Sequence, residues 1–283
     1  MSEEQTRRKL ALASAGDVAR HVGLDGTGAR VIRDAHNTVV LLPAAGVVAK
    51  VSTSTLDGRG ESALRRELRI GLHLSARNAP IVSPLANGAA GPHEVNGLVL
   101  TLWNYSVPES APRVPGDELG QALRAVHEAL ADFPDPLPLL SEKLTQAAAL
   151  FADPAQTPKL TATDRQLAAS VYGKLHLDES HLQGKSFLHG EPHARNVLWT
   201  REGPLFIDFE AACIGPIEWD VAYLPEEARA VFPECDQRML GQLGVAISFC
   251  VAAWCWAQLG RAPEVDEAAL HHLDVLKNVH EAE

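Results

Sequence analysis

The chain has 283 residues, of which 46% are hydrophobic and 22% are charged. This composition is ordinary for a globular protein with a sizeable core. The formal net charge of −11 argues against a nucleic-acid partner, because such proteins present a basic face to the phosphates. The acidity lies after residue 103: residues 1–103 carry 12 Lys and Arg against 9 Asp and Glu, whereas residues 104–283 carry 13 against 27.

No segment predicts export or insertion in a membrane. Charged side chains are spread through the first twenty residues, which excludes the apolar core of a signal peptide there. The longest apolar stretch, 245–257, is too short to span a bilayer comfortably and is typical of a buried helix. The four cysteines have no metal-binding spacing, so we expect reduced, mostly buried thiols. We expect a cytoplasmic protein without a membrane partner that is a monomer or a weak dimer.

The N-terminal part predicts a β-meander followed by a helix. Short apolar runs separated by turn-forming residues are typical of consecutive antiparallel strands, and they lie at residues 31–32, 39–42 and 47–51. Residues 61–76 repeat leucines with a period of 3.6, which predicts an amphipathic helix. A further strand at 98–103 precedes the proline-rich stretch 104–115, where we place the linker between two lobes.

The remaining chain is predicted to be mainly helical. Helical patterns cover residues 120–131, 163–177 and 237–258. Two short apolar runs, 187–189 and 205–207, suit small strands on either side of the loop at 190–196. We therefore predict an N-terminal lobe at residues 1–103 and a C-terminal lobe at residues 104–283.

Lys50 is a candidate for binding phosphate. It is flanked by apolar residues, so its ammonium must point toward a cleft or a counter-charge. Glu67 lies on the following predicted helix and is the natural counter-charge. A strand lysine paired with a helix glutamate holds the nucleotide phosphates in the kinase fold. The alternative is a surface lysine on an edge strand.

The segment from His189 to Asp208 has the spacing of a phosphoryl-transfer loop. Glu191 is followed five residues later by Asn196, and Asp208 comes twelve residues after that. The spacing matches the pattern H-x-D-x-x-x-x-N followed by an aspartate at a strand end, except that the carboxylate is a glutamate. Asn196 and Asp208 offer the oxygen ligands that Mg²⁺ prefers. Glu191 would act as the base beside an acceptor hydroxyl.

The runs FLHGEPHARNVL at residues 187–198 and FIDFE at residues 206–210 resemble the aminoglycoside phosphotransferase and choline kinase family. The resemblance extends over about residues 29–225. It implies an α+β, two-lobed protein-kinase-like fold, with a small β-rich N-terminal lobe and a larger, mainly helical C-terminal lobe. It also implies transfer of the γ-phosphoryl group of ATP or GTP, with Mg²⁺, to a hydroxyl of a small molecule.

The same resemblance implies roles for single residues. Asn37 falls in the phosphate loop, and Leu102 and Trp103 fall in the hinge that holds the base. His193 takes the place of a charged residue near the γ-phosphate. His189 would be structural and would tie the catalytic loop to the core.

Glu191 departs from the family, which almost always has aspartate at this position. The extra methylene moves the carboxylate by roughly 1.5 Å, and a misplacement on that scale can lower a rate on the order of a hundredfold. Two hypotheses follow. The first is an active phosphotransferase, and the acidic second part of the chain favours a cationic acceptor such as an antibiotic or an amino alcohol. The second is a nucleotide-binding pseudokinase with little or no transfer activity.

A metal-dependent hydrolase is a third interpretation of the segment His189-Gly190-Glu191-Pro192-His193. The zinc pattern H-E-x-x-H needs both histidines on one face of a helix. Pro192 after a glycine would disrupt that helix, so the sequence favours phosphoryl transfer over a zinc site.

Overall fold

The computed structural model describes residues 3–34, 37–53, 60–109, 116–175 and 186–281. Contacts divide the chain into two compact units. The first comprises residues 1–134, 189–212 and 225–231, and the second comprises residues 135–188, 213–224 and 232–283. This division cuts across the predicted lobe boundary at residue 103, which stays a prediction.

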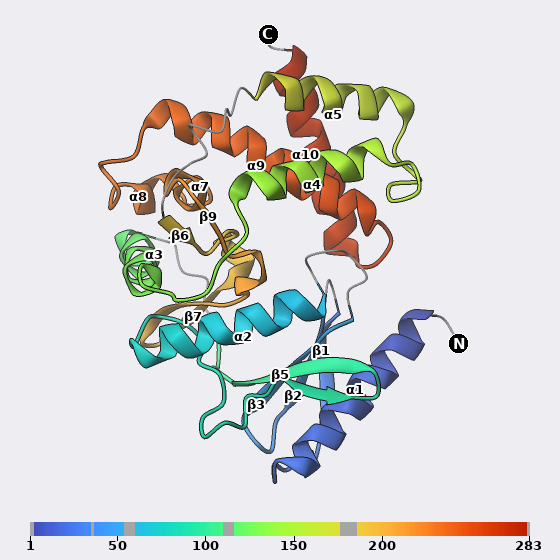
Figure 1. The fold of residues 1–283 in the computed structure, drawn as a ribbon, viewed down its shortest axis with the longest axis vertical. Helices are drawn as coiled ribbons and strands as arrows, with labels where there is room; N and C mark the ends of the chain where they lie inside the picture. The colour runs from blue at the N-terminus through green and yellow to red at the C-terminus, as the bar shows by residue number, and fades with distance from the viewer. Residues whose placement is uncertain (1–2, 35–36, 54–59, 110–115, 176–185, 282–283) are drawn as a thin grey trace. The chain divides into compact units, whose positions relative to one another are not determined.

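A five-stranded antiparallel sheet lies in the first unit (Figure 1), with the strand order β1-β2-β3-β5-β4. The strands are β1 (Arg30–Asp34), β2 (Thr38–Leu42), β3 (Val47–Val51), β4 (His93–Val95) and β5 (Leu98–Asn104). Four of them coincide with the predicted strands. The strand β4 was missed because its three residues are too few to show a periodic pattern.

One face of this sheet packs on α1 (Glu3–His21). Val40, Ala49 and Leu102 are fully buried on this face, against Ala11 and Ala15 of the helix. Fully burying one such valine or leucine contributes about 1.5–3 kcal/mol. Helix α1 was not predicted from the sequence, because its contact face consists mainly of alanines and lacks a stripe of large apolar side chains.

The rest of the first unit contains α2 (Glu61–Ala76), α3 (Asp117–Leu130), α8 (Glu226–Arg229) and the hairpin of β7 (Val197–Thr200) and β8 (Gly203–Phe206). Single 3₁₀ turns, η1 (Ala194–Asn196) and η2 (Phe209–Ala211), flank this hairpin. The predicted leucine stripe of α2 is confirmed, since Leu64, Leu68 and Leu74 are buried. In Figure 1, α2 and α3 lie on the side of the sheet away from α1.

The second unit is mainly helical. It contains α4 (Leu140–Ala152), α5 (Ala162–Lys174), α7 (Glu218–Val221), α9 (Gln237–Ala257), α10 (Pro263–Glu281) and the strands β6 (Ser186–Leu188) and β9 (Cys213–Gly215). The two strands predicted around the 190–196 loop exist as β6 and β8. Each pairs with a strand that the sequence did not reveal: β6 pairs with β9, and β8 pairs with β7.

Helix α9 forms the core of the second unit. By length and composition it could cross a membrane, but 61% of its most apolar window is buried inside the structure. The core helix of a globular protein has the same properties, so this one helix is weak evidence of a membrane span. The cytoplasmic location stays a prediction.

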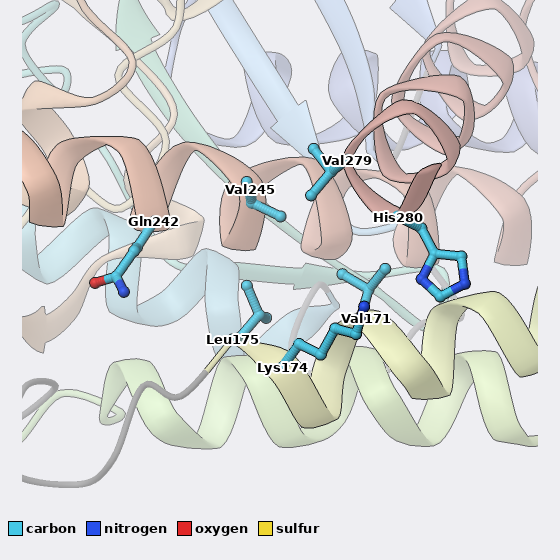
Figure 2. Close-up of a pocket in the computed structure, with 7 residues that line it drawn as sticks. All are labelled: Val171, Lys174, Leu175, Gln242, Val245, Val279 and His280. Carbon is cyan, nitrogen blue, oxygen red and sulfur yellow. The ribbon is translucent and has the colours of Figure 1, made fainter. Parts of the chain in front are cut away.

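A small pocket of about 130 Å³ lies between α5, α9 and α10 (Figure 2). Its walls are aliphatic side chains, and its polar lining consists of Lys174, Gln242 and His280. None of the predicted catalytic or metal-binding residues lines it.

Two glycine substitutions should have opposite effects on stability. A Cβ at Gly120 in α3 would lie 2.3 Å from the carbonyl oxygen of Ala228, so Gly120→Ala should destabilise the protein by about 1–3 kcal/mol. A Cβ at Gly241 in α9 would meet nothing within 4 Å, so Gly241→Ala should stabilise it by about 0.5–1 kcal/mol through helix propensity. Urea unfolding followed by circular dichroism measures both, and equal effects would contradict the close packing of α3.

Candidate active site

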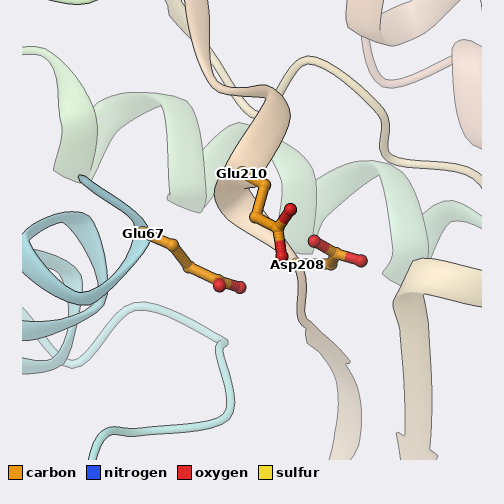
Figure 3. A group of neighbouring side chains, drawn as sticks. All are labelled: Glu67, Asp208 and Glu210. Carbon is orange, nitrogen blue, oxygen red and sulfur yellow. The ribbon is translucent and has the colours of Figure 1, made fainter. Parts of the chain in front are cut away.

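Lys50 lies among three carboxylates in the first unit. Its Nζ is 2.8 Å from Oε2 of Glu67, 2.9 Å from Oδ1 of Asp208 and 2.6 Å from Oε1 of Glu210. Figure 3 shows these carboxylates converging, Glu67 from α2 and the other two from the segment after β8. A buried ammonium requires such partners, because an unpaired buried charge costs several kcal/mol.

Glu67 connects three parts of the unit. Both of its carboxylate oxygens accept hydrogen bonds from Lys50, at 3.0 and 2.8 Å. Its Oε1 also accepts the backbone amide of Phe209 at 3.2 Å. The predicted counter-charge of Lys50 therefore joins α2 to β3 and to the segment that follows Asp208.

Glu210 is the member of this cluster that sequence reasoning missed. Its Oε1 accepts hydrogen bonds from Lys50 and, at 2.7 Å, from Nδ2 of Asn37. Oδ1 of Asn37 accepts the backbone amide of Thr53 at 3.0 Å. The turn that holds Asn37 is thus linked to the segment that holds Asp208. One signal was available in the sequence: Glu210 is a second acidic residue, two positions after Asp208, in a run that is otherwise apolar. The structure buries it, with only 3% of the residue exposed.

The cluster contains more negative charge than Lys50 can neutralise. Burial raises the pKa of Glu67 to about 8, and the charges of Asp208 and Glu210 add to this rise while Lys50 opposes it. Burial lowers the pKa of Lys50, but the three carboxylates outweigh this effect and raise that pKa above its ordinary value. A bound proton or a divalent cation would therefore stabilise the cluster.

The β7–β8 hairpin brings Asn196 and Asp208 together, because Asn196 precedes its first strand and Asp208 follows its second strand at the same end of the hairpin. Val197 opposes Phe206 in the hairpin, and the amide of Ile207 donates to the carbonyl of Asn196 at 3.0 Å. Asp208 follows with a left-handed backbone, φ 70° and ψ 66°, a conformation that aspartate tolerates better than most residues. Residues twelve apart in sequence become neighbours in this way.

Asn196 presents an oxygen that suits a cation. The residue is 2% exposed, and its Nδ2 donates to the carbonyl of Glu191 at 3.0 Å. Its Oδ1 is buried and has no hydrogen-bond partner among the residues that the structure describes. A buried acceptor without a partner costs about 1–3 kcal/mol, and a hard cation would satisfy it. Together with the carboxylate of Asp208 and the surplus of negative charge, this donor set fits Mg²⁺.

The loop that holds Glu191 is fixed by its backbone. Gly190 has φ +89°, and a Cβ there would lie 2.1 Å from the carbonyl oxygen of Ala211. His189 is fully buried, donates from Nε2 to the carbonyl of Ile207 at 3.1 Å and accepts the amide of Glu191 at Nδ1. His189 thus connects the loop of Glu191 to the segment that holds Ile207, which is the structural role that the family resemblance implied. The side chain of Glu191 is held in a buried environment, with the residue 8% exposed.

His193 differs from the charged residue that was expected at its position. Burial lowers the pKa of His193, and the charge of Arg33 adds to this effect, although Glu191 and Asp208 oppose it. At neutral pH the imidazole is therefore uncharged, so it can form hydrogen bonds but brings no positive charge. Its role near the γ-phosphate stays a prediction.

The predicted hinge residues have buried side chains. Leu102 is fully buried, its amide donates to the carbonyl of Ala90, and its carbonyl accepts the amide of Leu85, both at 2.9 Å. The indole of Trp103 is also buried, and its Nε1 donates to Oγ1 of Thr101 at 2.8 Å. These side chains belong to the core, so a base contact would have to come from nearby backbone. The hinge assignment stays a prediction.

The sequence profile of one known family, described as the phosphotransferase enzyme family, matches residues 28–259. The chain belongs to this phosphotransferase family. No curated protein matches the sequence.

Several solved structures resemble this phosphotransferase. The GDP complex of wild-type aminoglycoside 2'-phosphotransferase-IIIa has a TM-score of 0.65 at 15% identity, over 95% of this chain and 99% of that one. A choline/ethanolamine kinase family protein from Mesorhizobium loti has a TM-score of 0.63 at 18% identity, over 95% and 94% of the two chains. Amicoumacin kinase hAmiN, in complex with AMP-PNP, Ca²⁺ and Ami, has a TM-score of 0.61 at 12% identity, over 88% of each chain. At such low identities the similarity shows the fold alone. The structural similarity confirms the predicted α+β, kinase-like architecture.

Glu67 should make the stability of the phosphotransferase depend on pH. Its pKa is about 8 in the folded protein and near 4.3 in an unfolded chain, so between these values the folded state holds one proton more. The free energy of unfolding should then fall as pH rises from 5 to 8, by at most about 1.4 kcal/mol per pH unit. Urea unfolding at pH 6, 7 and 8 measures this slope.

Glu67→Gln should flatten the slope, whereas Glu61→Gln should keep it, because the side chain of Glu61 is 58% exposed on the same helix. Equal slopes in the wild-type protein and Glu67→Gln would contradict the protonation of this cluster.

Proposed function

We propose that this phosphotransferase transfers the γ-phosphoryl group of ATP or GTP to a hydroxyl of a small acceptor. The observation that carries the proposal is the binding of Lys50 to Glu67 and Asp208, in the same unit as the buried, unsatisfied oxygen of Asn196. Phosphoryl transfer requires a cation on the donor phosphates and oxygen ligands for a metal ion. Structural relatives with bound GDP or AMP-PNP support the nucleotide part of the proposal.

Each side chain of the cluster has a role in this proposal. Lys50 would bind donor phosphates, and Glu67 would keep the ammonium in position, with support from Glu210. Asn196 and Asp208 would hold Mg²⁺. When bound, Mg²⁺ would neutralise charge on the phosphates.

Glu191 would orient the acceptor hydroxyl and take its proton. The hydroxyl oxygen would form a bond to the γ-phosphorus while the bond from that phosphorus to the bridging oxygen of the nucleoside diphosphate breaks. Glu191 suits this role because its loop is fixed by Gly190 and His189 and its carbonyl is bound by Asn196. This hydrogen bond links the backbone of Glu191 to the side-chain amide of Asn196, the proposed metal ligand.

The acceptor is proposed to be small and cationic, such as an aminoglycoside-like antibiotic or an amino alcohol. Residues 104–283 carry 27 Asp and Glu against 13 Lys and Arg, and complementary charge favours encounter with a cation. One similar structure contains GDP and kanamycin, and another belongs to the choline/ethanolamine kinase family. These relatives define the panel of acceptors to be tested first.

Glu191 decides between the enzyme and the pseudokinase. With ATP or GTP, Mg²⁺ and a panel of hydroxylated amines, the wild-type protein should form a phosphorylated product. Glu191→Gln should lower kcat by about 100-fold or more, as expected for loss of a general base, while nucleotide affinity stays within about threefold. Mass spectrometry of the acceptor and calorimetry of nucleotide binding measure these quantities.

The exposed Glu202→Gln variant is the matched control and should keep full activity. Nucleotide binding without any product, in the wild-type protein and in Glu191→Asp, would support the pseudokinase and contradict the proposed transfer.

Asn196 should control metal affinity. Asn196→Ala removes the buried oxygen, so the affinity for Mn²⁺ in the presence of ADP should fall by roughly tenfold or more, the value of one good charge-assisted contact. Asn196→Asp keeps an oxygen at this place and should retain most of the affinity. Electron paramagnetic resonance of free Mn²⁺ measures both variants. Unchanged Mn²⁺ affinity in a folded Asn196→Ala protein would exclude Asn196 as a ligand.

A further inference from the structure

Arg33 stands in the same row of the sheet as Lys50. Arg33 on β1 opposes Val39 on β2, and Val39 opposes Lys50 on β3. Directly opposed residues of antiparallel strands point to the same face of a sheet. The side chains of Arg33 and Lys50 therefore share the face opposite α1, and the backbones of their strands lie two strand spacings, or roughly 9.6 Å, apart.

An irregularity in β1 produces this alignment. Val31 opposes Val40, yet Arg33 opposes Val39, so Ile32 is an extra residue in the strand. In a regular strand Ile32 would oppose Val39, and Arg33 would point to the face covered by α1. The bulge leaves Ile32 48% exposed and directs Arg33 to the face of Lys50. Bulges of this kind often redirect a side chain beside an active site.

Asp34, the residue after Arg33, points to the opposite face of the sheet. The carboxylate of Asp34 is bound by Arg7 of α1, at 2.9 Å between Nη2 and Oδ2, and by the hydroxyl of Thr38 at 2.8 Å. Asp34 thus points toward α1, as its register predicts, and this anchor fixes the end of β1. Arg33 is held in the opposite direction by the same backbone.

The charge of Arg33 acts on the loop of Glu191, and no described residue neutralises it. The guanidinium acts electrostatically on His193, so its charge reaches the loop of Glu191. Among the described residues, the guanidinium of Arg33 forms neither a hydrogen bond nor an ion pair. Lys50, by contrast, is already surrounded by three carboxylates. Of the two cations in this described row, Arg33 is therefore the one whose charge no described carboxylate neutralises.

We propose that Arg33 binds the terminal phosphoryl group of the nucleotide, as a second cation beside Lys50. This role rests on the proposed function. A guanidinium presents several N–H donors to phosphate oxygens and stays charged at every relevant pH. In that position it would stabilise the charge on the phosphoryl group as it is transferred.

Calorimetry with a triphosphate and a diphosphate tests the role. The probes are AMP-PNP and ADP, and in parallel GMP-PNP and GDP, each with Mg²⁺. Arg33→Gln should weaken triphosphate binding by about tenfold or more, as expected for a lost contact with a charged group, and should change diphosphate binding by less than twofold. Arg33→Lys should restore part of the loss. Arg20→Gln, an exposed arginine of α1, removes the same charge and should change neither affinity.

An exchange variant keeps the composition constant. Ile32→Arg combined with Arg33→Ile retains the net charge but moves the cation out of the row of Lys50, so it should behave like Arg33→Gln.

If the wild-type protein binds no nucleotide, both this role and the proposed function are overturned. If it binds both nucleotides and Arg33→Gln weakens them equally or not at all, only the role of Arg33 is overturned.

Discussion

The pairing of one buried ammonium with three carboxylates is the constraint on which the first unit depends. Lys50 is bound by Glu67 from α2 and by Asp208 and Glu210 from the segment after β8. Removing the ammonium would leave the buried carboxylates of Glu67 and Glu210 without their main partner, which is expected to cost several kcal/mol. The interaction that joins the sheet, α2 and the segment after β8 is therefore the one that the proposed phosphate binding would use.

This cluster is not electrically balanced, and the imbalance bears on function. Three carboxylates around one ammonium leave a surplus of negative charge, and the charges of Asp208 and Glu210 add to the effect of burial in raising the pKa of Glu67. A polyphosphate would be repelled by this surplus, so binding it requires additional cations. The unsatisfied oxygen of Asn196 offers a place for a metal ion. The bulge in β1 directs Arg33 to the same face, where it would supply a second permanent charge.

The segments that hold Glu191 and Asp208 are fixed by backbone features as much as by side chains. Gly190 approaches the carbonyl of Ala211 too closely for any side chain, and Asp208 adopts a left-handed conformation. Such conformations persist only where the surrounding structure determines them, and they are concentrated at functional sites. Here the bonds of His189 to Ile207 and to Glu191 supply that support. The loop of Glu191 is therefore joined to the end of the β7–β8 hairpin.

The sequence alone determined the features that are local along the chain. The spacing of Glu191, Asn196 and Asp208 predicted a phosphoryl-transfer loop, and periodicity located α2 and most of the strands, because both signals lie within a few neighbouring residues. Only the tertiary structure decided which distant residues meet. It placed Glu210 beside Lys50, paired the short strands β6 and β8 with partners that carry no periodic signal, and turned Arg33 to the face of Lys50 through a one-residue bulge. Strand register and the pairing of buried charges arise from contacts between distant segments, which no local pattern records.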